Sequence, residues 1–585
     1  MTCPRSCARF CNCSESVLTK QEAAAALRHY AVLLELLGED PFRARAFENA
    51  ARMLETQPEN LDVLIAENRL SAVRGIGKGV ATAICDLSAR GTFAELEEAR
   101  QGVPSGVIEL LRVEGLGPKK ARTLWKDAQV TSLAALENAI EAGLIERLPG
   151  FGAKTAQKFR VGLAFLKSTS GRHWRHHAVR AAESLRESLK DMAGVREVFF
   201  GGSLRRGNET VGDLDVLLVA EEGQANAVRA RIVSLSFVRW SEAGHILRGE
   251  LASGFPVELS VTAPDEAGAR KILATGSKEH VRALQEIASR KGYTLDPQGV
   301  GNVLHEGSEE QVYAALGLAY VPPPLREGGE SVFAVGSRTF PDPVRLNQIR
   351  GILHCHTTAS DGHHSLRELA AATIERGYEY LGVADHSQSA AYAHGLTPER
   401  VLSQWKEIDE LNGELAPFRI LKGTEADILP DGRLDFDDEL LAGFDFVVAS
   451  VHSGFNMSED DATARLCRAL ENPQVDILGH PTGRLLLERN GYRVNHSRLI
   501  DCAARHGKAI ELNCSPHRLD LDWRFLALAE AKRVLVPLCP DAHHIEGLWD
   551  IRWGVEVAAK GPLTAANCPS TWSADEFLQW CASHT

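Results

Sequence analysis

Hydrophobic and polar positions follow different periods in different parts of the chain. Between residues 17 and 165, apolar residues recur at helical spacing, as in VLTKQEAAAALRHYAVLLELLGE and FRARAFENAARMLE. Residues 195–262 contain the short β-like runs VREVFFGG, GDLDVLLVA and FPVELSV, and a helical stretch follows over 263–292. From residue 351 to about residue 560, short apolar runs alternate with helical runs, which predicts parallel strands joined by helices. Residues 319–350, rich in proline and glycine, predict a linker between domains.

The composition is that of a large globular protein. A chain of 585 residues requires several hydrophobic cores. Its 44% apolar and 24% charged residues exclude a disordered or collagen-like protein, and no apolar run reaches the ~18 residues of a membrane-spanning helix. The net charge of −13 does not exclude a nucleic-acid partner, because local charge determines binding. Twelve cysteines spread along the chain favour a reducing cytoplasm, and an N-terminus without an apolar core argues against secretion.

A glycine motif occurs three times in the helical part of the chain. Each copy has two glycines around one apolar residue, with lysine close behind. The glycines allow a tight turn that leaves backbone N–H groups exposed at the start of the next helix, where they can bind a phosphate. Ordinary helix–helix turns are the alternative, but three copies with lysines favour binding of the DNA backbone. They resemble helix-hairpin-helix motifs, with candidate DNA-binding residues Gly75, Gly77, Lys78, Gly115, Gly117, Lys119, Lys120, Gly150, Gly152 and Lys154.

Two aspartates lie on the predicted strand GDLDVLLVA. Asp213 and Asp215 are two positions apart, so their carboxylates project from the same face of the strand. A divalent cation such as Mg²⁺ relieves their repulsion and also binds phosphate. Gly202, Ser203 and Arg206 precede them and are candidates for holding a triphosphate. A solvated acidic edge strand, the alternative, does not explain the GGSLRRG segment.

Histidines and carboxylates follow the apolar runs of the C-terminal part. Fourteen of the 21 histidines lie after residue 350. In a β/α barrel the C-terminal ends of the parallel strands meet at one face, where active sites lie. Mixed histidine and carboxylate ligands suit zinc, manganese or iron, and so many of them indicate a cluster of ions. The run KAIELNCSP adds a strand without an obvious ligand. The other runs end in His354, His356, Asp385, His386, Glu425, His452, His480, Asp541 and His543.

The GS…RRG…GDLD signature and the Thr275-Gly276-Ser277 turn give residues 17–320 a specific resemblance to family X DNA polymerases. Residues 351–560 resemble the polymerase-and-histidinol-phosphatase (PHP) domain of bacterial members. The resemblance implies a multidomain α+β and α/β fold with a nucleotidyltransferase palm and a seven-stranded β/α PHP barrel. The expected boundaries are a leader over 1–16 with Cys3, Cys7, Cys11 and Cys13, helix-hairpin-helix domains over 17–95 (8-kDa-like) and 96–170 (fingers), the palm over 171–262, the thumb over 263–320, a linker over 321–350 and the PHP domain over 351–585.

The resemblance also implies roles for the candidate residues. Two-metal phosphoryl transfer with Mg²⁺ or Mn²⁺ is implied for Asp213, Asp215 and a third carboxylate, Glu258. The implied nucleotide-binding residues are Gly202, Ser203, Arg206, Gly212, Thr275 and Gly276. Up to three divalent metals (Mn²⁺, Zn²⁺ or Fe) are implied at His354, His356, Asp361, His386, Glu425, His452, His480, Asp541 and His543. Candidate phosphate clamps, with surface salt bridges as the alternative, are Arg484, Arg489 and Arg518.

The sequence departs from the family pattern in the palm and thumb. Glu258 replaces an aspartate, and a carboxylate displaced by about an ångström can lose on the order of 10²-fold in rate. Leu273 and Ala274 replace two aromatic residues, and Val281 and Gln285 replace an asparagine and an arginine. We therefore expect weakened polymerisation.

Two departures lie outside the palm and thumb. Ala83 replaces the lysine that would form a Schiff base with an abasic sugar, so little lyase activity is expected. Ile352 replaces an acidic residue ahead of the first histidine pair.

The leading hypothesis is a monomeric, cytoplasmic DNA repair enzyme. It would fill gaps in gapped or nicked duplexes with deoxynucleoside triphosphates and hydrolyse 3′ ends, without a membrane partner. One alternative is a nuclease or phosphatase whose palm only binds DNA. Another is an inert DNA-binding scaffold, which the intact set of metal ligands disfavours. Primer extension on a gapped duplex, in Mg²⁺ and in Mn²⁺, distinguishes the first two.

Overall fold

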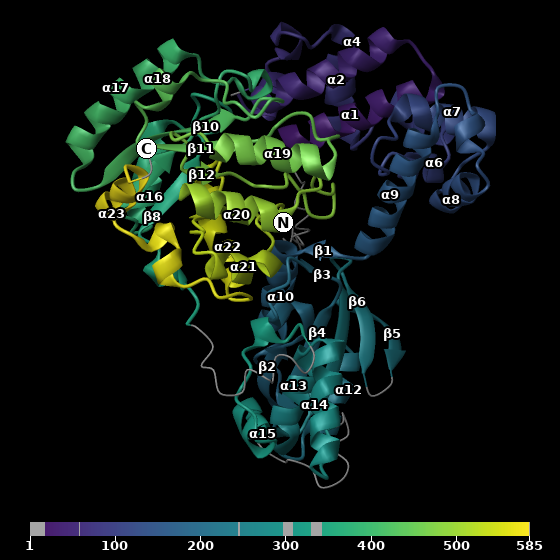
Figure 1. Cartoon of the computed structure of the whole chain (residues 1–585). Helices are drawn as coiled ribbons and strands as arrows, with labels where there is room; N and C mark the ends of the chain where they lie inside the picture. The colour runs from purple at the N-terminus through teal and green to yellow at the C-terminus, as the bar shows by residue number, and fades with distance from the viewer. Residues whose placement is uncertain (1–17, 58, 244–245, 296–307, 329–341, 584–585) are drawn as a thin grey trace, which may run out of the picture. The chain divides into compact units, whose positions relative to one another are not determined.

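The computed structural model describes residues 18–57, 59–243, 246–295, 308–328 and 342–583 (Figure 1). The expected leader with its four cysteines lies outside these ranges. The chain forms two compact units, Met1–Ser170 and Gly171–Thr585. None of the helices in the described ranges is long and apolar enough to cross a membrane.

The first unit is helical, as its sequence pattern predicts. Helix α1 begins at Thr19, whose side chain accepts a hydrogen bond from the backbone of Glu22, and it ends at Gly38 with φ of 79°. Tyr30 and Phe93 lie in the core at a centroid distance of 5.0 Å. The helices are α1 (Lys20–Leu37), α2 (Pro41–Thr56), α3 (Leu61–Ala66), α4 (Lys78–Arg90), α5 (Ala94–Gly102), α6 (Ser105–Leu110), α7 (Pro118–Ala128), α8 (Leu133–Glu141) and α9 (Ala153–Thr169).

The second unit begins with a mixed sheet in the order β2-β4-β7-β6-β5. Its strands are β2 (Val195–Phe200), β4 (Leu214–Ala220), β5 (Val238–Ala243), β6 (Leu247–Leu251) and β7 (Pro256–Thr262). The three predicted runs form β2, β4 and β7, which confirms that part of the prediction. Strands β4 and β7 pair in parallel, and the other described pairs of this sheet are antiparallel. Around the sheet lie α10 (Arg175–Leu189), α11 (Gly202–Arg205), α12 (Ala225–Val233) and the short pair β1 (His173–Trp174) and β3 (Thr210–Val211).

A helical subdomain follows the mixed sheet. It contains α13 (Ala267–Thr275), α14 (Lys278–Arg290) and α15 (Glu309–Ala315). The helical stretch expected over 263–292 is divided at Gly276, because the Ser277 side chain caps α14 by accepting a hydrogen bond from the backbone of His280. Val321 packs into the core of this subdomain, so its packing extends beyond residue 320.

A buried ion network joins this subdomain to the mixed sheet. Arg326 is 0% exposed, and its guanidinium lies 2.6 Å from one carboxylate oxygen of Glu309. The other oxygen lies 2.6 Å from Arg205, which also donates a hydrogen bond to the Thr275 hydroxyl. A buried charge is stable only with its partner present, so Glu309 fixes both arginines.

The rest of the second unit is a barrel of parallel strands surrounded by helices. Strands β8 (Gly351–Cys355), β9 (Tyr380–Val383), β10 (Arg419–Asp427), β11 (Phe446–Ser450), β12 (Ile477–Leu478) and β13 (Ala509–Ile510) form one sheet in sequential order. After β13, β14 (Leu512–Asn513) pairs in parallel with β15 (Leu538–Cys539), and a parallel bridge between Cys355 and Ala542 joins β15 to β8. The ring is thereby closed, and every apolar run expected to form a barrel strand does so.

Helices occupy the segments between the barrel strands (Figure 1). Helix α17 packs on β10, α20 on β13 and α22 on β15. The helices are α16 (Leu366–Glu375), α17 (Pro398–Leu415), α18 (Asp438–Leu441), α19 (Glu459–Leu470), α20 (His496–His506), α21 (Leu526–Ala531), α22 (Ile551–Ala558) and α23 (Ala574–Cys581). The described 3₁₀ helices of the chain are η1 (Leu70–Ala72), η2 (Ile145–Arg147), η3 (Pro264–Glu266), η4 (Pro323–Leu325), η6 (Leu346–Gln348), η7 (Ala391–Ala393), η8 (Trp523–Phe525), η9 (Ile545–Asp550), η10 (Ala565–Asn567) and η11 (Pro569–Thr571).

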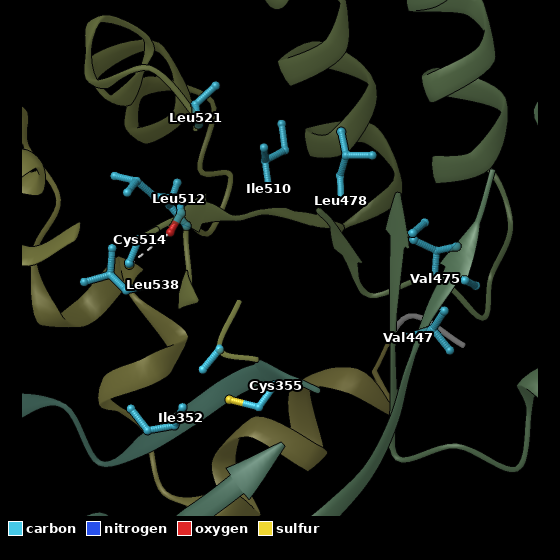
Figure 2. Close-up of a cluster of buried hydrophobic side chains, with 14 of the residues drawn as sticks. Ile352, Cys355, Val447, Val475, Leu478, Ile510, Leu512, Cys514, Leu521 and Leu538 are labelled. Atoms are coloured by element: carbon cyan, nitrogen blue, oxygen red, sulfur yellow. Dashed lines mark hydrogen bonds between the residues drawn. The ribbon is translucent and has the colours of Figure 1, made fainter. Parts of the chain in front are cut away.

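The barrel core is apolar, and Figure 2 shows part of it around Ile352, Cys355 and Leu538. Ile352 is fully buried among these side chains. The position that carries an acidic residue in the family pattern therefore belongs to the packed core of this chain.

Substitution Glu309→Gln should destabilise the second unit by about 3–5 kcal/mol, because Arg326 would keep its buried charge and lose its counter-charge. The measurement is the thermal unfolding midpoint of the full chain. The neighbouring and exposed Glu310 provides a matched control, since Glu310→Gln should leave the midpoint unchanged. Equal midpoints for the two variants would contradict the prediction.

Candidate active sites

Three carboxylates meet on the mixed sheet. Asp215 on β4 and Glu258 on β7 are register partners, and Asp213 immediately precedes β4. One oxygen from each of the three lies within 4.8 Å of the others. Burial, with the charges of Asp213 and Glu258, raises the pKa of Asp215 to about 7. Such crowding of carboxylates favours a divalent cation, which removes the mutual repulsion. The structure thus brings together the three residues that the sequence indicated.

Glu258 contacts a basic side chain in addition to lying near the two aspartates. Arg248 on β6 is its antiparallel register partner, and the Arg248 Nε donates a hydrogen bond to Glu258 Oε1 at 2.6 Å. The longer glutamate therefore reaches the aspartates while one of its oxygens is bound to an arginine. This pairing had no signal in the sequence, because β6 was not among the predicted runs.

The candidate nucleotide-binding residues lie beside the carboxylates. Gly202, with φ of 56°, approaches so closely that a Cβ atom there would lie 1.6 Å from Asp215 Oδ2. Arg206 Nε lies 3.0 Å from Glu327, and Arg206 Nη1 donates to the Thr275 carbonyl at 2.8 Å. A triphosphate would therefore compete with Glu327 for Arg206. Of the remaining candidates, Ser203 lies in α11, Gly212 precedes Asp213 and Gly276 separates α13 from α14.

Glu425, near the C-terminal end of β10, lies within 4 Å of five histidines of the barrel, the farthest being His356, whose Nε2 is 3.6 Å from Glu425 Oε2. Its Oε1 is 2.9 Å from His480 Nε2, 3.2 Å from His452 Nε2 and 3.4 Å from His354 Nε2. Its Oε2 is 2.9 Å from His386 Nδ1. These residues lie near the ends of five different strands, β8 to β12, so closure of the barrel is what brings them together.

Two more carboxylates complete the group. Asp541 Oδ1 lies 3.2 Å from His356 Nε2, and Asp361 Oδ1 lies 3.5 Å from His543 Nε2 and 3.6 Å from His386 Nε2. The candidate ligand atoms form overlapping groups that share several residues. All nine residues expected to bind metal belong to these groups: His354, His356, Asp361, His386, Glu425, His452, His480, Asp541 and His543.

The barrel site has the properties of a metal cluster. His354 Nε2, both ring nitrogens of His356 and Glu425 Oε1 are buried, and none has a partner at hydrogen-bond geometry among the described residues. Buried polar atoms without partners are unfavourable, and metal ligation would satisfy them. Burial, with the charges of His543 and His386, lowers the pKa of His356 to about 3, so this ring is neutral as ligation requires. The residues therefore fit divalent metal ions.

Two buried carboxylates that orient histidines were not predicted. One oxygen of Glu511 lies 2.7 Å from His354 Nδ1, and the other accepts a hydrogen bond from the His480 backbone at 2.6 Å. Asp427 lies 2.5 Å from His452 Nδ1. Such carboxylates fix the tautomer of a ligating histidine. A glutamate inside the apolar run KAIELNC was the available signal for Glu511.

Asp385 also ends a barrel strand, and it has a different role. Its carboxylate accepts hydrogen bonds from the Thr357 backbone and hydroxyl, and from Ser360 and Gln404. The groups of candidate ligands among the described residues do not include it. Asp385 thus holds the turn after the first histidine pair.

The three candidate arginine clamps differ in their contacts. Arg484 forms an ion pair with Asp522 at 2.7 Å and donates to the Arg518 carbonyl. Arg489 donates to the Gly483 carbonyl at 3.1 Å. Arg518 Nε lies 3.6 Å from Asp541 Oδ2, next to the ligand group. Of the three, Arg518 lies beside a candidate metal ligand, while Arg484 and Arg489 stabilise loops.

The three glycine motifs of the first unit share one geometry. Gly75, Gly115 and Gly150 have φ of 90°, 79° and 80°, in the left-handed region. Each is followed two residues later by a glycine that precedes a helix, so that α4, α7 and α9 begin at Lys78, Pro118 and Ala153. The helix starts have no side-chain cap, which leaves their N–H groups available to a phosphate.

The lysines of these motifs are not equivalent. Lys78, Lys119 and Lys154 are exposed. Lys120 donates to the Gly115 carbonyl at 3.3 Å and lies over the Phe159 ring, so it supports the turn itself. Ala83 is buried in α4, at the position that the family pattern gives to the lyase lysine.

Family models match successive parts of the chain. They are a helix-hairpin-helix domain over 19–93, a SAM-like helix-hairpin-helix tandem over 107–164, the DNA polymerase beta palm over 172–263, the DNA polymerase beta thumb over 271–327 and a PHP domain over 353–515. Over 554 residues the chain is 38% identical to the DNA polymerase/3'-5' exonuclease PolX of Bacillus subtilis, covering 93% of this chain and 95% of that protein. The chain belongs to the PolX family.

Other relatives of this PolX family member match a shorter stretch of the chain. A probable phosphatase of Caldanaerobacter subterraneus is 33% identical over 168 residues, or 28% of this chain and 61% of that protein. A probable phosphatase of Caldicellulosiruptor bescii is 30% identical over 209 residues, or 33% of this chain and 78% of that protein. The family-level expectation from the sequence is confirmed: a family X polymerase with a PHP domain. Divalent metal use follows from the same domains.

Substitution Glu511→Gln should weaken metal binding by the PHP domain on the order of 10- to 100-fold. The two carboxylate oxygens of Glu511 now accept hydrogen bonds from His354 Nδ1 and from the backbone N–H of His480. An amide would direct its NH₂ group, a donor, toward one of these two donors. Titration of metal against a competing chelator measures the affinity. The exposed Glu414 gives a control, Glu414→Gln, that should bind metal as the wild type does. Unchanged affinity in Glu511→Gln would contradict this role.

Replacing Lys78, Lys119 and Lys154 together by alanine should weaken DNA binding equally across sequences, because exposed lysines at these helix starts are expected to meet phosphates and not bases. The plot of log affinity against log salt should flatten by about one unit for each phosphate that the protein no longer neutralises. Fluorescence anisotropy at several salt concentrations gives the slope. Lys126→Ala, at the far end of α7, is the single-charge control. An unchanged slope in the triple variant would show that the motifs are structural turns.

Proposed function

We propose that this protein is a DNA repair enzyme that combines gap-filling nucleotide addition with 3′→5′ hydrolysis of DNA ends. The observation that carries the proposal is the presence of two separate carboxylate-rich sites, one on the mixed sheet and one in the barrel. The name of the Bacillus subtilis relative, a DNA polymerase/3'-5' exonuclease, supports the same pair of activities. The three glycine motifs provide sequence-independent contacts with the DNA backbone.

In the palm, Asp213 and Asp215 would hold Mg²⁺ or Mn²⁺. When bound, these ions neutralise phosphate charge and stabilise the charge that develops during phosphoryl transfer. Glu258 is the carboxylate assigned to take the proton from the primer 3′-hydroxyl, since it faces Asp215 across the parallel register. The segment from Gly202 to Arg206, with Gly212, Thr275 and Gly276, would bind the triphosphate.

In the barrel, the nine-residue set around Glu425 would hold up to three divalent ions (Mn²⁺, Zn²⁺ or Fe). Bound ions there supply Lewis-acid polarisation of the phosphate and activate water for in-line attack. Glu511 and Asp427 hold the rings of His354 and His452 in the orientation that ligation needs. Arg518 is the arginine we assign to the DNA phosphate beside the site, because it lies next to Asp541.

A second candidate function is a nuclease or phosphatase whose palm contributes mainly DNA binding. Two thumb positions favour it. Gln285 donates its amide to the Leu295 carbonyl at 2.9 Å, and a Cβ on Gly276 would lie 3.0 Å from a Val281 methyl group. These side chains stabilise the thumb and offer no charge to a nucleotide. Primer extension on a gapped duplex, in Mg²⁺ and in Mn²⁺, decides between the two functions.

The proposed substrates are gapped or nicked duplex DNA, 3′ ends and deoxynucleoside triphosphates. The proposed location is the cytoplasm, and the proposed state is a monomer. The inert scaffold is the weaker alternative, because nine potential ligands gathered in overlapping groups, five of them buried, have no function in it.

Combined replacement of Asp213 and Asp215 by alanine should abolish nucleotide addition and leave 3′ hydrolysis intact. His356→Ala or Asp541→Ala should do the reverse, because the two candidate metal sites share no residue. Chelators should remove hydrolysis and Mn²⁺ should restore it best. Primer extension and 3′-end degradation are measured side by side, with metal content from elemental analysis. Hydrolysis that survives both barrel substitutions, with less than one transition metal per chain, would show that the barrel is not the nuclease.

A further inference from the structure

An exposed aromatic side chain lies beside the histidines of the barrel. Tyr392, in η7, is 68% exposed. Its ring centroid lies 6.1 Å from that of His386 and 6.3 Å from that of His452, two candidate metal ligands. Single exposed apolar side chains are common on protein surfaces, so exposure alone carries no argument. The place of this ring, at the edge of the ligand group, needs an explanation.

The loop that carries Tyr392 is fixed at both ends. The backbone N–H of Leu396 donates to the His386 carbonyl at 2.8 Å, so the loop returns to the strand end where it began. The backbone N–H of Ser389 donates to the Asp435 carboxylate at 2.8 Å. A Cβ on Gly395 would lie 1.9 Å from the Ser387 carbonyl, which shows how closely the loop is packed. The backbone that carries the ring is therefore held at a defined position.

The Tyr392 ring combines proximity to the ligand group with an open surface. Its centroid lies within 6.3 Å of those of both His386 and His452, while the residue is 68% exposed. Ring surface beside the ligand group is therefore open to a planar ligand.

We propose that Tyr392 is the stacking platform for the base of the 3′-terminal nucleotide hydrolysed in the barrel. The proposal rests on the proposed 3′→5′ hydrolysis. One sugar separates a base from its phosphate, so the base can lie on Tyr392 while the phosphate lies among His386, His452 and the other ligands. Stacking on an aromatic ring accepts any base, which suits an enzyme that shortens DNA of any sequence.

The test compares full-length, metal-loaded wild type with Tyr392→Ala and Tyr392→Phe. Two oligonucleotides differ only at the 3′ end, which is a normal nucleotide in one and an abasic nucleotide in the other. For the normal end, Tyr392→Ala should raise KM on the order of 5- to 100-fold with little change in kcat. For the abasic end, wild type and Tyr392→Ala should have the same KM. Tyr392→Phe should behave as wild type with both, because the ring is retained.

Three results would overturn the assignment. An equal loss on both oligonucleotides would mean that Tyr392 supports the site and not the base. A Tyr392→Phe variant as weak as Tyr392→Ala would assign the effect to the hydroxyl, and no loss in either variant would remove Tyr392 from the substrate site. Metal content and Leu402→Ala, an exposed apolar position on α17, provide controls that should match the wild type. Hydrolysis that persists in His356→Ala would instead overturn the proposed function of the barrel.

Discussion

The burial of Glu425 among five histidines is the interaction on which the barrel site depends. In water each of these groups would be hydrated, and inside the barrel some of their polar atoms have no hydrogen-bond partner among the described residues. Removing charges and polar atoms from water is unfavourable unless strong partners replace the hydration. The apolar core beneath the site supplies the compensating free energy, and bound metal would supply the partners. The ligand group therefore depends on the apolar core for the free energy that keeps its polar side chains buried at the end of the barrel.

The elements that the sequence predicts well are those whose signals are local. The barrel strands appear as apolar runs, and the candidate ligands lie at or just after the ends of these runs because parallel strands end at one face. The glycine motifs are equally local, since left-handed φ at Gly75, Gly115 and Gly150 follows from the residue type. The strand ends alone indicate eight of the nine candidate ligands, and the family resemblance adds Asp361.

The parts that sequence reasoning missed depend on contacts between strands. Glu511 looks like an interruption in an apolar run until β13 and β8 are placed in one barrel, where it reaches His354. Asp385 ends a strand as the ligands do, yet its oxygens are taken by the turn after β8. The contact of Arg248 with Glu258 becomes evident only from the register of β6 with β7. Spacing along the chain contains no information about these partners.

In the proposed enzyme, the product of the palm is the substrate of the barrel. Both sites need the same 3′ end, and the glycine motifs hold DNA without regard to sequence, so the outcome depends on which site binds that end more tightly. Two ion pairs in the palm oppose the binding of a triphosphate and metal ions. Arg206 is paired with Glu327, and Glu258 is paired with Arg248. A triphosphate and metal ions must each displace or share an existing ion pair there. The barrel ligands, in contrast, already point at one another. Hydrolysis should therefore dominate when triphosphates are scarce, and synthesis should dominate only when they are plentiful enough to hold the 3′ end in the palm.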